Sequence, residues 1–333
     1  ERFTMPGHGA HTGNAYYSFD LGPLHVVAFN AEAFFWPEYF DEAYMSRMYE
    51  WLVTDLRDAN DDRANTPWVM VHGHRPMYCV DPKVPDLTPH ANKPEFAGVC
   101  GWEKQAVRKG VASECEDEYA ALGCSASTAR ESTRGSSTAA RPRRAGGASP
   151  EGIWKASGES SGDFPIEKLL FDAGVDLYLA GHVHDYERYF PVYDEHVVNG
   201  TDVTLGRYVN PGATVHVTSG SGGNPEMWTE GMYNVSDKKR PTPRGTCSHR
   251  APWCAFQSGF APKRTGAGYV YDFTYSRITV HDDETLEWEQ VSAPSGALAG
   301  DGKKAVGEVI DRFVISAATH GPFASRGEKI ATE

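Results

Sequence analysis

The sequence predicts an α/β protein with a β-rich C-terminal region, and three observations support this fold class. Residues 68–71 (Trp-Val-Met-Val) form a short apolar run, which is typical of a fully buried strand in a parallel sheet. A helix expected at 165–173, with Gly174 directly after it, leads straight into an apolar strand at 176–180. A helix that feeds a buried strand is half of a βαβ unit. After Tyr193 the chain shows the pattern of successive strands.

The N-terminal elements are expected to be a strand pair followed by a long helix. Strands are expected at 16–19 and 24–29, joined by a turn at Leu21-Gly22-Pro23. In the next segment apolar side chains recur at helical spacing on one face, at Tyr44, Met48, Trp51, Leu52 and Leu56. Asp41 is the expected N-cap of this helix, because its carboxylate can accept from the first free backbone N–H groups.

The C-terminal region is predicted to be a set of short strands that alternate or run apolar between turns. They are expected at 214–218, 268–275, 277–281, 285–291 and 309–315. Residues 125–152 contrast with them, because this stretch lacks every large apolar residue and is rich in Ser, Ala, Gly and Arg. Such a composition cannot bury apolar surface, so a disordered insert is expected within 123–163.

Composition excludes two function classes and favours one compartment. Among the 333 residues, 45 are Asp or Glu and 32 are Lys or Arg, so the net charge of −13 argues against a nucleic-acid partner. No run of about 18 apolar residues is present, which argues against a membrane span. Six cysteines and two glycosylation sequons, at Asn199 and Asn234, favour an oxidising compartment. The protein is therefore expected to be secreted or to lie in the secretory pathway, vacuole or lysosome.

Two histidine-rich segments carry the chemistry. Val71-His72-Gly73-His74 follows the apolar run at 68–71, and Gly181-His182-Val183-His184 follows the strand at 176–180. Ligands bind at the carboxyl ends of strands in open α/β sheets, and imidazole is a common metal ligand. His72 is expected to belong to the strand, and the glycines are expected to let the backbone turn beside the site. The spacing therefore predicts a metal site built from two strand exits.

At these two segments the sequence resembles the purple acid phosphatases, a branch of the calcineurin-like metallophosphoesterases. The resemblance is carried by Gly73-His74-Arg75-Pro76-Met77-Tyr78 and Gly181-His182-Val183-His184-Asp185-Tyr186-Glu187-Arg188. It extends over most of the chain outside 81–162 and implies a partial β-sandwich flanked by helices. It also implies two regions: residues 1–193 as the C-terminal part of the catalytic domain, and residues 194–333 as the C-terminal region of the family.

The resemblance implies a two-metal phosphatase that acts on phosphate monoesters. His74 and His182 would bind the divalent metal (Zn²⁺, Mn²⁺ or Fe²⁺), and His184 would bind the Fe³⁺. The family also uses a histidine in the loop after the first motif to contact the phosphate or to protonate the leaving group. His90 is the candidate for that role, because no other histidine lies between Cys79 and His182.

The remaining metal-ligand motifs of the family do not occur in these residues. They have the forms G-D-x-G, G-D-x-x-Y and G-N-H-E, and they supply the carboxylates, a tyrosinate and an asparagine. Three imidazoles without carboxylates hold two hard cations poorly, so this chain alone is expected to be inactive or nearly so. Two alternatives stay open: a non-catalytic interaction module on the same scaffold, and a fragment of another metallophosphoesterase such as a phosphodiesterase.

Overall fold

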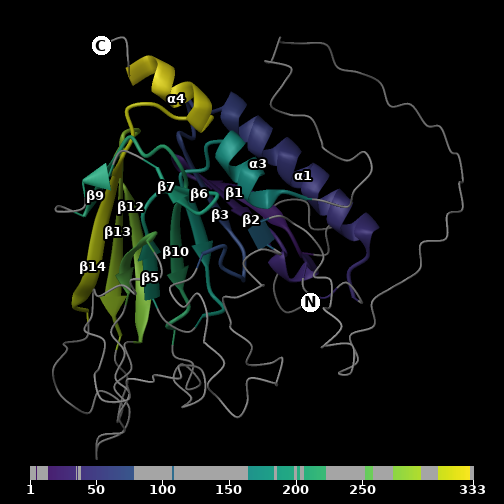
Figure 1. Cartoon of the computed structure of the whole chain (residues 1–333), viewed down its shortest axis with the longest axis horizontal. Helices are drawn as coiled ribbons and strands as arrows, with labels where there is room; N and C mark the ends of the chain where they lie inside the picture. Colours follow the sequence, from purple (N-terminus) through teal and green to yellow (C-terminus); the bar gives the residue numbers. More distant parts are fainter. Residues whose placement is uncertain are drawn as a thin grey trace, which may run out of the picture.

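The computed structural model describes Met5 and residues 14–34, 36, 39–78, 107–108, 164–183, 186–198, 201–202, 206–222, 252–257, 273–293 and 307–330. These residues form three layers: two helices, a seven-stranded sheet, and a five-stranded sheet on the far side of it (Figure 1). The expected insert at 123–163 lies outside the described residues. The α/β fold class, with a β-rich C-terminal region, is confirmed.

The seven-stranded sheet has a parallel centre and antiparallel edges. Strands β2, β3, β4 and β10 pair in parallel, whereas β1, β5 and β11 pair antiparallel with their neighbours. In spatial order its strands are β1 (Tyr17–Leu21), β2 (Leu24–Ala28), β3 (Trp68–His72), β4 (Leu177–Ala180), β10 (Val215–Ser219), β5 (Tyr186–Tyr189) and β11 (Cys254–Gln257). The strands expected at the two histidine motifs are therefore neighbours, and their carboxyl ends lie at one edge.

The five-stranded sheet comes entirely from residues after 200. Its strands in spatial order are β12 (Thr274–Val280), β13 (Thr285–Ser292), β14 (Val309–Ser316), β9 (Arg207–Val209) and β8 (Thr201–Asp202), and a small hairpin of β6 (Val192–Tyr193) and β7 (His196–Val197) stands apart. Two separate strands were expected at 268–275 and 277–281. Residues 274–280 instead form one strand, because exposed and more buried side chains alternate across Ser276 without a turn.

The helices begin and end where the local sequence predicts. Helix α1 (Glu42–Asp61) is capped by Asp41, whose Oδ1 accepts a hydrogen bond of 2.7 Å from the Tyr44 amide. Helix α3 (Ile166–Asp172) follows Pro165 and ends before Gly174. A short 3-10 turn, η1 (Ala31–Phe34), and a C-terminal helix, α4 (Phe323–Ile330), complete the helical elements of the described chain.

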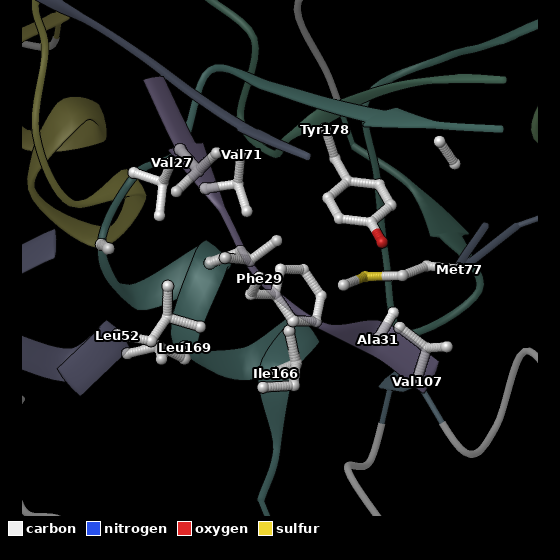
Figure 2. Packing of buried hydrophobic residues seen from close by; sticks show 14 of the residues in the cluster. Val27, Phe29, Ala31, Leu52, Val71, Met77, Val107, Ile166, Leu169 and Tyr178 are labelled. Atoms are coloured by element: carbon white, nitrogen blue, oxygen red, sulfur yellow. The ribbon is translucent and has the colours of Figure 1, made fainter. Parts of the chain in front are cut away.

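Two hydrophobic cores lie on the two faces of the seven-stranded sheet. Since side chains alternate along a strand, Val27 and Val71 pack against α1 and α3, whereas Val26 and Met70 pack toward the five-stranded sheet. Figure 2 shows the first core, in which Leu52 and Leu169 approach these strands from the helices. In the second core the largest side chains of the five-stranded sheet are Trp288 and Phe313. The expected sandwich flanked by helices is thus confirmed, with α1 and α3 on one outer face.

A buried carboxylate connects the elements at the end of the sheet where β3 and β4 begin. Asp176, 1% exposed, accepts from Arg63 Nη1 at 3.0 Å, from Arg326 Nη2 at 2.9 Å and from the Val69 amide at 3.0 Å. Burial alone would raise the pKa of Asp176, but the two guanidinium groups hold it well below its ordinary value. One side chain therefore joins the end of α1, the start of β3 and helix α4.

The division into regions at residue 193 stays a prediction. Strands β10 and β11, which follow that position, pair with β4 and β5 in the seven-stranded sheet. Cys254, in β11, is disulfide-bonded, in keeping with the oxidising compartment expected from the sequence. No helix in the described part of the chain has the length and apolar character needed to cross a membrane.

Candidate functional site

The two histidine motifs meet at the carboxyl ends of β3 and β4. The loops are joined through the backbone, because the Gly73 amide donates to Leu179 O at 3.1 Å and the Gly181 amide donates to His74 O at 3.0 Å. His74 Nε2 lies 3.0 Å from His182 Nδ1, and the two ring centroids are 4.9 Å apart. The parallel pairing of these strands, read from two apolar runs, is what brings the rings together.

The shape of the two loops comes from close packing and from one left-handed residue. A Cβ on Gly73 would lie 2.9 Å from the Tyr178 hydroxyl and 3.0 Å from the Phe29 ring, so only glycine fits there. The same hydroxyl donates to Arg75 O at 2.8 Å and fixes the loop (Figure 2 shows Tyr178 beside Phe29 and Met77). The sequence assigned the sharp turn to glycine, but the residue with positive φ is His182, at +57°. Strained backbone of this kind gathers at binding sites.

Glu32 and Arg75 lie beside the histidine pair, and no sequence pattern pointed to a role for either of them. Arg75 donates to Glu32 in bidentate geometry, with Nε 2.8 Å from Oε1 and Nη2 3.1 Å from Oε2. Its Nη1 lies 3.1 Å from His182 Nε2, and Glu32 Oε1 lies 3.8 Å from His74 Nε2. Burial would raise the pKa of Glu32, but Arg75 outweighs this and lowers it, so the carboxylate stays ionised.

The contact with Arg75 indicates which ring nitrogen of His182 carries the proton. A guanidinium can only donate, so His182 Nε2 is the acceptor of that contact and the neutral ring carries its proton on Nδ1. That proton then points to His74 Nε2 across the 3.0 Å contact. A cation bound at His182 Nδ1 would require this proton to move to Nε2, so the cation and the Arg75 contact compete for the ring.

The geometry of the two nitrogens fits one small cation. Two nitrogen ligands that bind Zn²⁺ at about 2.0–2.1 Å in a tetrahedral site stand about 3.3 Å apart, slightly more than the observed 3.0 Å. Among the described residues, no cluster of three or more His, Cys, Asp or Glu side chains is arranged to hold a metal ion. The described part of the chain therefore brings two imidazoles together without a third such side chain.

The second half of the longer motif holds the sandwich together. Tyr186 Oη donates to Asp311 Oδ2 at 2.7 Å, and Arg188 donates to both carboxylate oxygens, from Nε at 2.7 Å and Nη2 at 3.1 Å. All three side chains are buried, and Asp311 belongs to β14 of the other sheet. Tyr186 and Arg188 thus anchor the strand that follows His182 rather than the site itself.

The other predicted site residues lie outside the described part of the chain. This holds for His184, His90, Asn199 and Asn234, whose roles stay predictions. His72 is the last residue of β3, as its spacing from Met70 predicted. The sequence could have pointed to Glu32 only through its position after a strand of the same sheet, which is too common a feature to single out one carboxylate.

Comparison with known proteins finds acid phosphatases and purple acid phosphatases among the matches. Residues 213–311 match the family model described as iron/zinc purple acid phosphatase-like protein C. Acid phosphatase type 7 of Danio rerio is 30% identical over 327 residues, which cover 98% of this chain and 51% of that protein. The Homo sapiens protein of the same name is 30% identical over 291 residues, covering 87% of this chain and 45% of the relative. The chain thus spans about half the length of these relatives.

One solved structure aligns along most of the chain. It is a purple acid phosphatase from yellow lupin (Lupinus luteus) seeds, with 19% identity and a TM-score of 0.46, and the alignment covers 95% of this chain and 34% of the other.

Proposed function

Because the chain belongs to the purple acid phosphatase family, we propose that it supplies the last two histidine motifs of a metal-dependent acid phosphatase that hydrolyses phosphate monoesters. The observation that carries the proposal is the 3.0 Å approach of His74 Nε2 and His182 Nδ1 at the ends of two adjacent parallel strands. Imidazole nitrogens at this separation suit one divalent cation.

The proposed metal centre combines Fe³⁺ with Zn²⁺, Mn²⁺ or Fe²⁺. His74 and His182 hold the divalent cation, and His184 holds the Fe³⁺. The chemistry that such a pair of cations supplies is Lewis-acid stabilisation of the phosphoryl oxygens and acidification of water. The chain's own contribution is to hold the two rings together, because the Gly73 and Gly181 amides join the two loops through the backbone.

Two further assignments complete the proposal. His90 is the proposed phosphate contact or proton donor. The proposed location is outside the cell or in the secretory pathway, vacuole or lysosome, with glycans at Asn199 and Asn234. The disulfide of Cys254 supports this location.

Residues 1–333 alone are proposed to bind a divalent cation without appreciable turnover. The histidine motifs are present, but the carboxylate-bearing motifs G-D-x-G and G-D-x-x-Y are not among these residues. Two hard cations and the water between them need such oxygen ligands.

Calorimetric titration with Zn²⁺ tests the metal assignment. His74→Gln and His182→Gln are each expected to weaken Zn²⁺ binding at least about tenfold, because each removes one of the ligands. His281→Gln is the matched control, since this exposed histidine directly follows β12 of the five-stranded sheet and contacts Glu287. Equal Zn²⁺ affinity in all four proteins would contradict the assignment.

An assay with an aryl phosphate, after addition of iron and zinc, tests the activity. Negligible turnover by residues 1–333 is expected. Robust metal-dependent turnover that His182→Gln abolishes would refute the proposed dependence on the other motifs, while it would support the phosphatase function itself.

A further inference from the structure

Strand β1 forms one edge of the seven-stranded sheet, and its polar side chains contact helix α1. Among the described strands, β1 pairs with β2 alone. Side chains alternate along a strand, so Ser18 and Asp20 point to the same face, and Ser18 binds Asp55 of α1 there. A strand bonded on one side opens more easily than a central strand, so contacts outside the sheet decide how firmly β1 is held.

His25 joins this edge strand to the helix. It lies opposite Asp20 in the antiparallel register of β1 and β2, and its Nδ1 is 2.6 Å from Asp20 Oδ1. Its Nε2 is 3.1 Å from Asp55 Oδ2, and the other oxygen of Asp55 accepts from Ser18 Oγ at 2.5 Å. Side chains from β1, β2 and α1 therefore meet at one imidazole.

The two contacts of His25 require a charged ring. A carboxylate can only accept, so both ring nitrogens must carry a proton to donate to Asp20 and Asp55 at the same time. Burial would lower the pKa of His25, but the bonds to the two carboxylates outweigh burial and raise the pKa above its ordinary 6.5. A neutral imidazole has one N–H and one lone pair, so loss of the proton turns a lone pair toward one of the carboxylates.

The surroundings of His25 favour the charged ring from two sides. Among the described residues, the charged side chains that face it are Asp20 from β1 and Asp55 from α1, whereas its register partner in β3 is the apolar Val69. The side chains of His25 and Asp55 are 12% and 14% exposed, and that of Asp20 is 59% exposed. Salt screens a shielded pair less than an exposed one, so the contact with α1 persists at physiological salt.

We propose that Asp20, His25 and Asp55 form a clamp that acid closes: the charged imidazole ties the β1–β2 hairpin to α1, and loss of its proton releases the edge strand. By proton linkage, the clamp is fully closed below pH 6.5 and opens as the pH rises through the raised pKa of His25. The inference does not depend on the proposed phosphatase function, because its test needs neither metal nor substrate.

Amide hydrogen exchange of the metal-free chain at about pH 5.5 and about pH 8.5 tests the inference, with protection factors corrected for the intrinsic effect of pH on exchange. The amides of β1 report on the clamp, and those of β10, an interior strand of the same sheet, report on the whole fold. The variants are His25→Gln, whose amide cannot be charged, and Asp20→Asn, which changes an exposed side chain. His281→Gln is the matched control, since this exposed histidine also contacts a carboxylate, that of Glu287.

The protection of β1 in the wild-type chain is expected to fall roughly fivefold from the lower to the higher pH, while β10 exchanges more slowly throughout. His25→Gln is expected to show the lower protection at both pH values, Asp20→Asn to keep part of the dependence through Asp55, and His281→Gln to behave as the wild type. Protection of β1 that does not change with pH, a change that His25→Gln leaves intact, or equal exchange of β1 and β10 at the higher pH overturns the inference.

A second measurement needs no change at His25 itself. The titration midpoint of the His25 ring, followed by NMR, is expected to move to lower pH in Asp20→Asn and in Asp55→Asn, because each variant removes one of the two carboxylates that hold the charge. A midpoint that moves in neither variant also overturns the inference.

Discussion

His216 is buried as a neutral imidazole, and acid should therefore destabilise the fold through this one residue. It lies in β10, is 2% exposed, and packs between the rings of Tyr78 and Tyr178 at centroid distances of 4.9 Å and 5.5 Å. Neither ring nitrogen makes a hydrogen bond to the described residues. Burial, and secondarily the charge of Arg108, lower the pKa of His216 to about 3. A backbone contact of Val192 raises this pKa, but by less than the other two effects lower it.

The sign and size of the effect follow from proton linkage. The unfolded chain binds a proton at His216 near pH 6.5, whereas the folded chain does not bind it until about pH 3. The free energy of unfolding therefore keeps its full value above pH 6.5, and the proton at His216 lowers it as the pH falls toward 3. At about 1.36 kcal/mol per pH unit, the loss between pH 7.5 and pH 5 is about 2 kcal/mol.

His216→Leu isolates this contribution, because leucine has a similar volume, is apolar and does not titrate. The free energy of unfolding, from urea titrations at a series of pH values, is expected to shift in favour of the variant by about 2 kcal/mol between pH 7.5 and pH 5. His25 has the opposite effect on the free energy of unfolding, because its bonds to Asp55 and Asp20 outweigh burial and raise its pKa. Taking the difference between variant and wild type removes that contribution.

The exposed His281, replaced by glutamine, serves as the control, and its difference from wild type should stay within about 0.5 kcal/mol across the same range. A difference between His216→Leu and wild type that is equally flat would refute the reasoning. It would mean that the imidazole of His216 reaches water or a hydrogen-bond partner in the folded protein.

Three substitutions away from the histidine pair should act on stability. Asp176→Asn leaves two buried arginines without their counter-charge and should cost about 3–5 kcal/mol in urea unfolding; a loss under about 1 kcal/mol would contradict the buried ion-pair assignment. Asp311→Asn should cost a similar amount for the same reason, with thermal unfolding as the check. Gly174→Ala should cost more than about 2 kcal/mol, since φ is +63° and the new Cβ would stand 1.7 Å from Gly321 O; an unchanged Tm would show that the segment yields easily.

The sequence predicted the elements whose signals are local. The cap at Asp41, the helix before Gly174 and the strand ending at His72 need only neighbouring residues to be recognised, and all three are present. Strand β5 escaped prediction because its four residues, Tyr-Glu-Arg-Tyr, look polar. Arg188 can be buried because it donates to Asp311 and lies over the ring of Phe313. Both partners come more than a hundred positions later in the chain.

In the candidate site, too, features with local signals could be predicted and features that depend on distant residues could not. The meeting of His74 and His182 could be inferred, because parallel strands place their carboxyl ends at one edge whatever the loops contain. Glu32 could not be inferred, since its place beside Arg75 depends on where the turn after β2 packs. Left-handed His182 was also hidden, because a neighbouring glycine offered the simpler explanation of the turn.

The acid sensitivity of His216 and the geometry of the site are connected through one tyrosine. The ring of Tyr178 packs on His216, and its hydroxyl holds the carbonyl of Arg75 at 2.8 Å. His216 stays neutral in the folded chain down to about pH 3, so both contacts of Tyr178 persist over the pH range in which the fold is stable. Acid therefore reaches the loop of His74 through loss of the whole fold, because protons bind at His216 in the unfolded chain, rather than through charging of this ring in the native state.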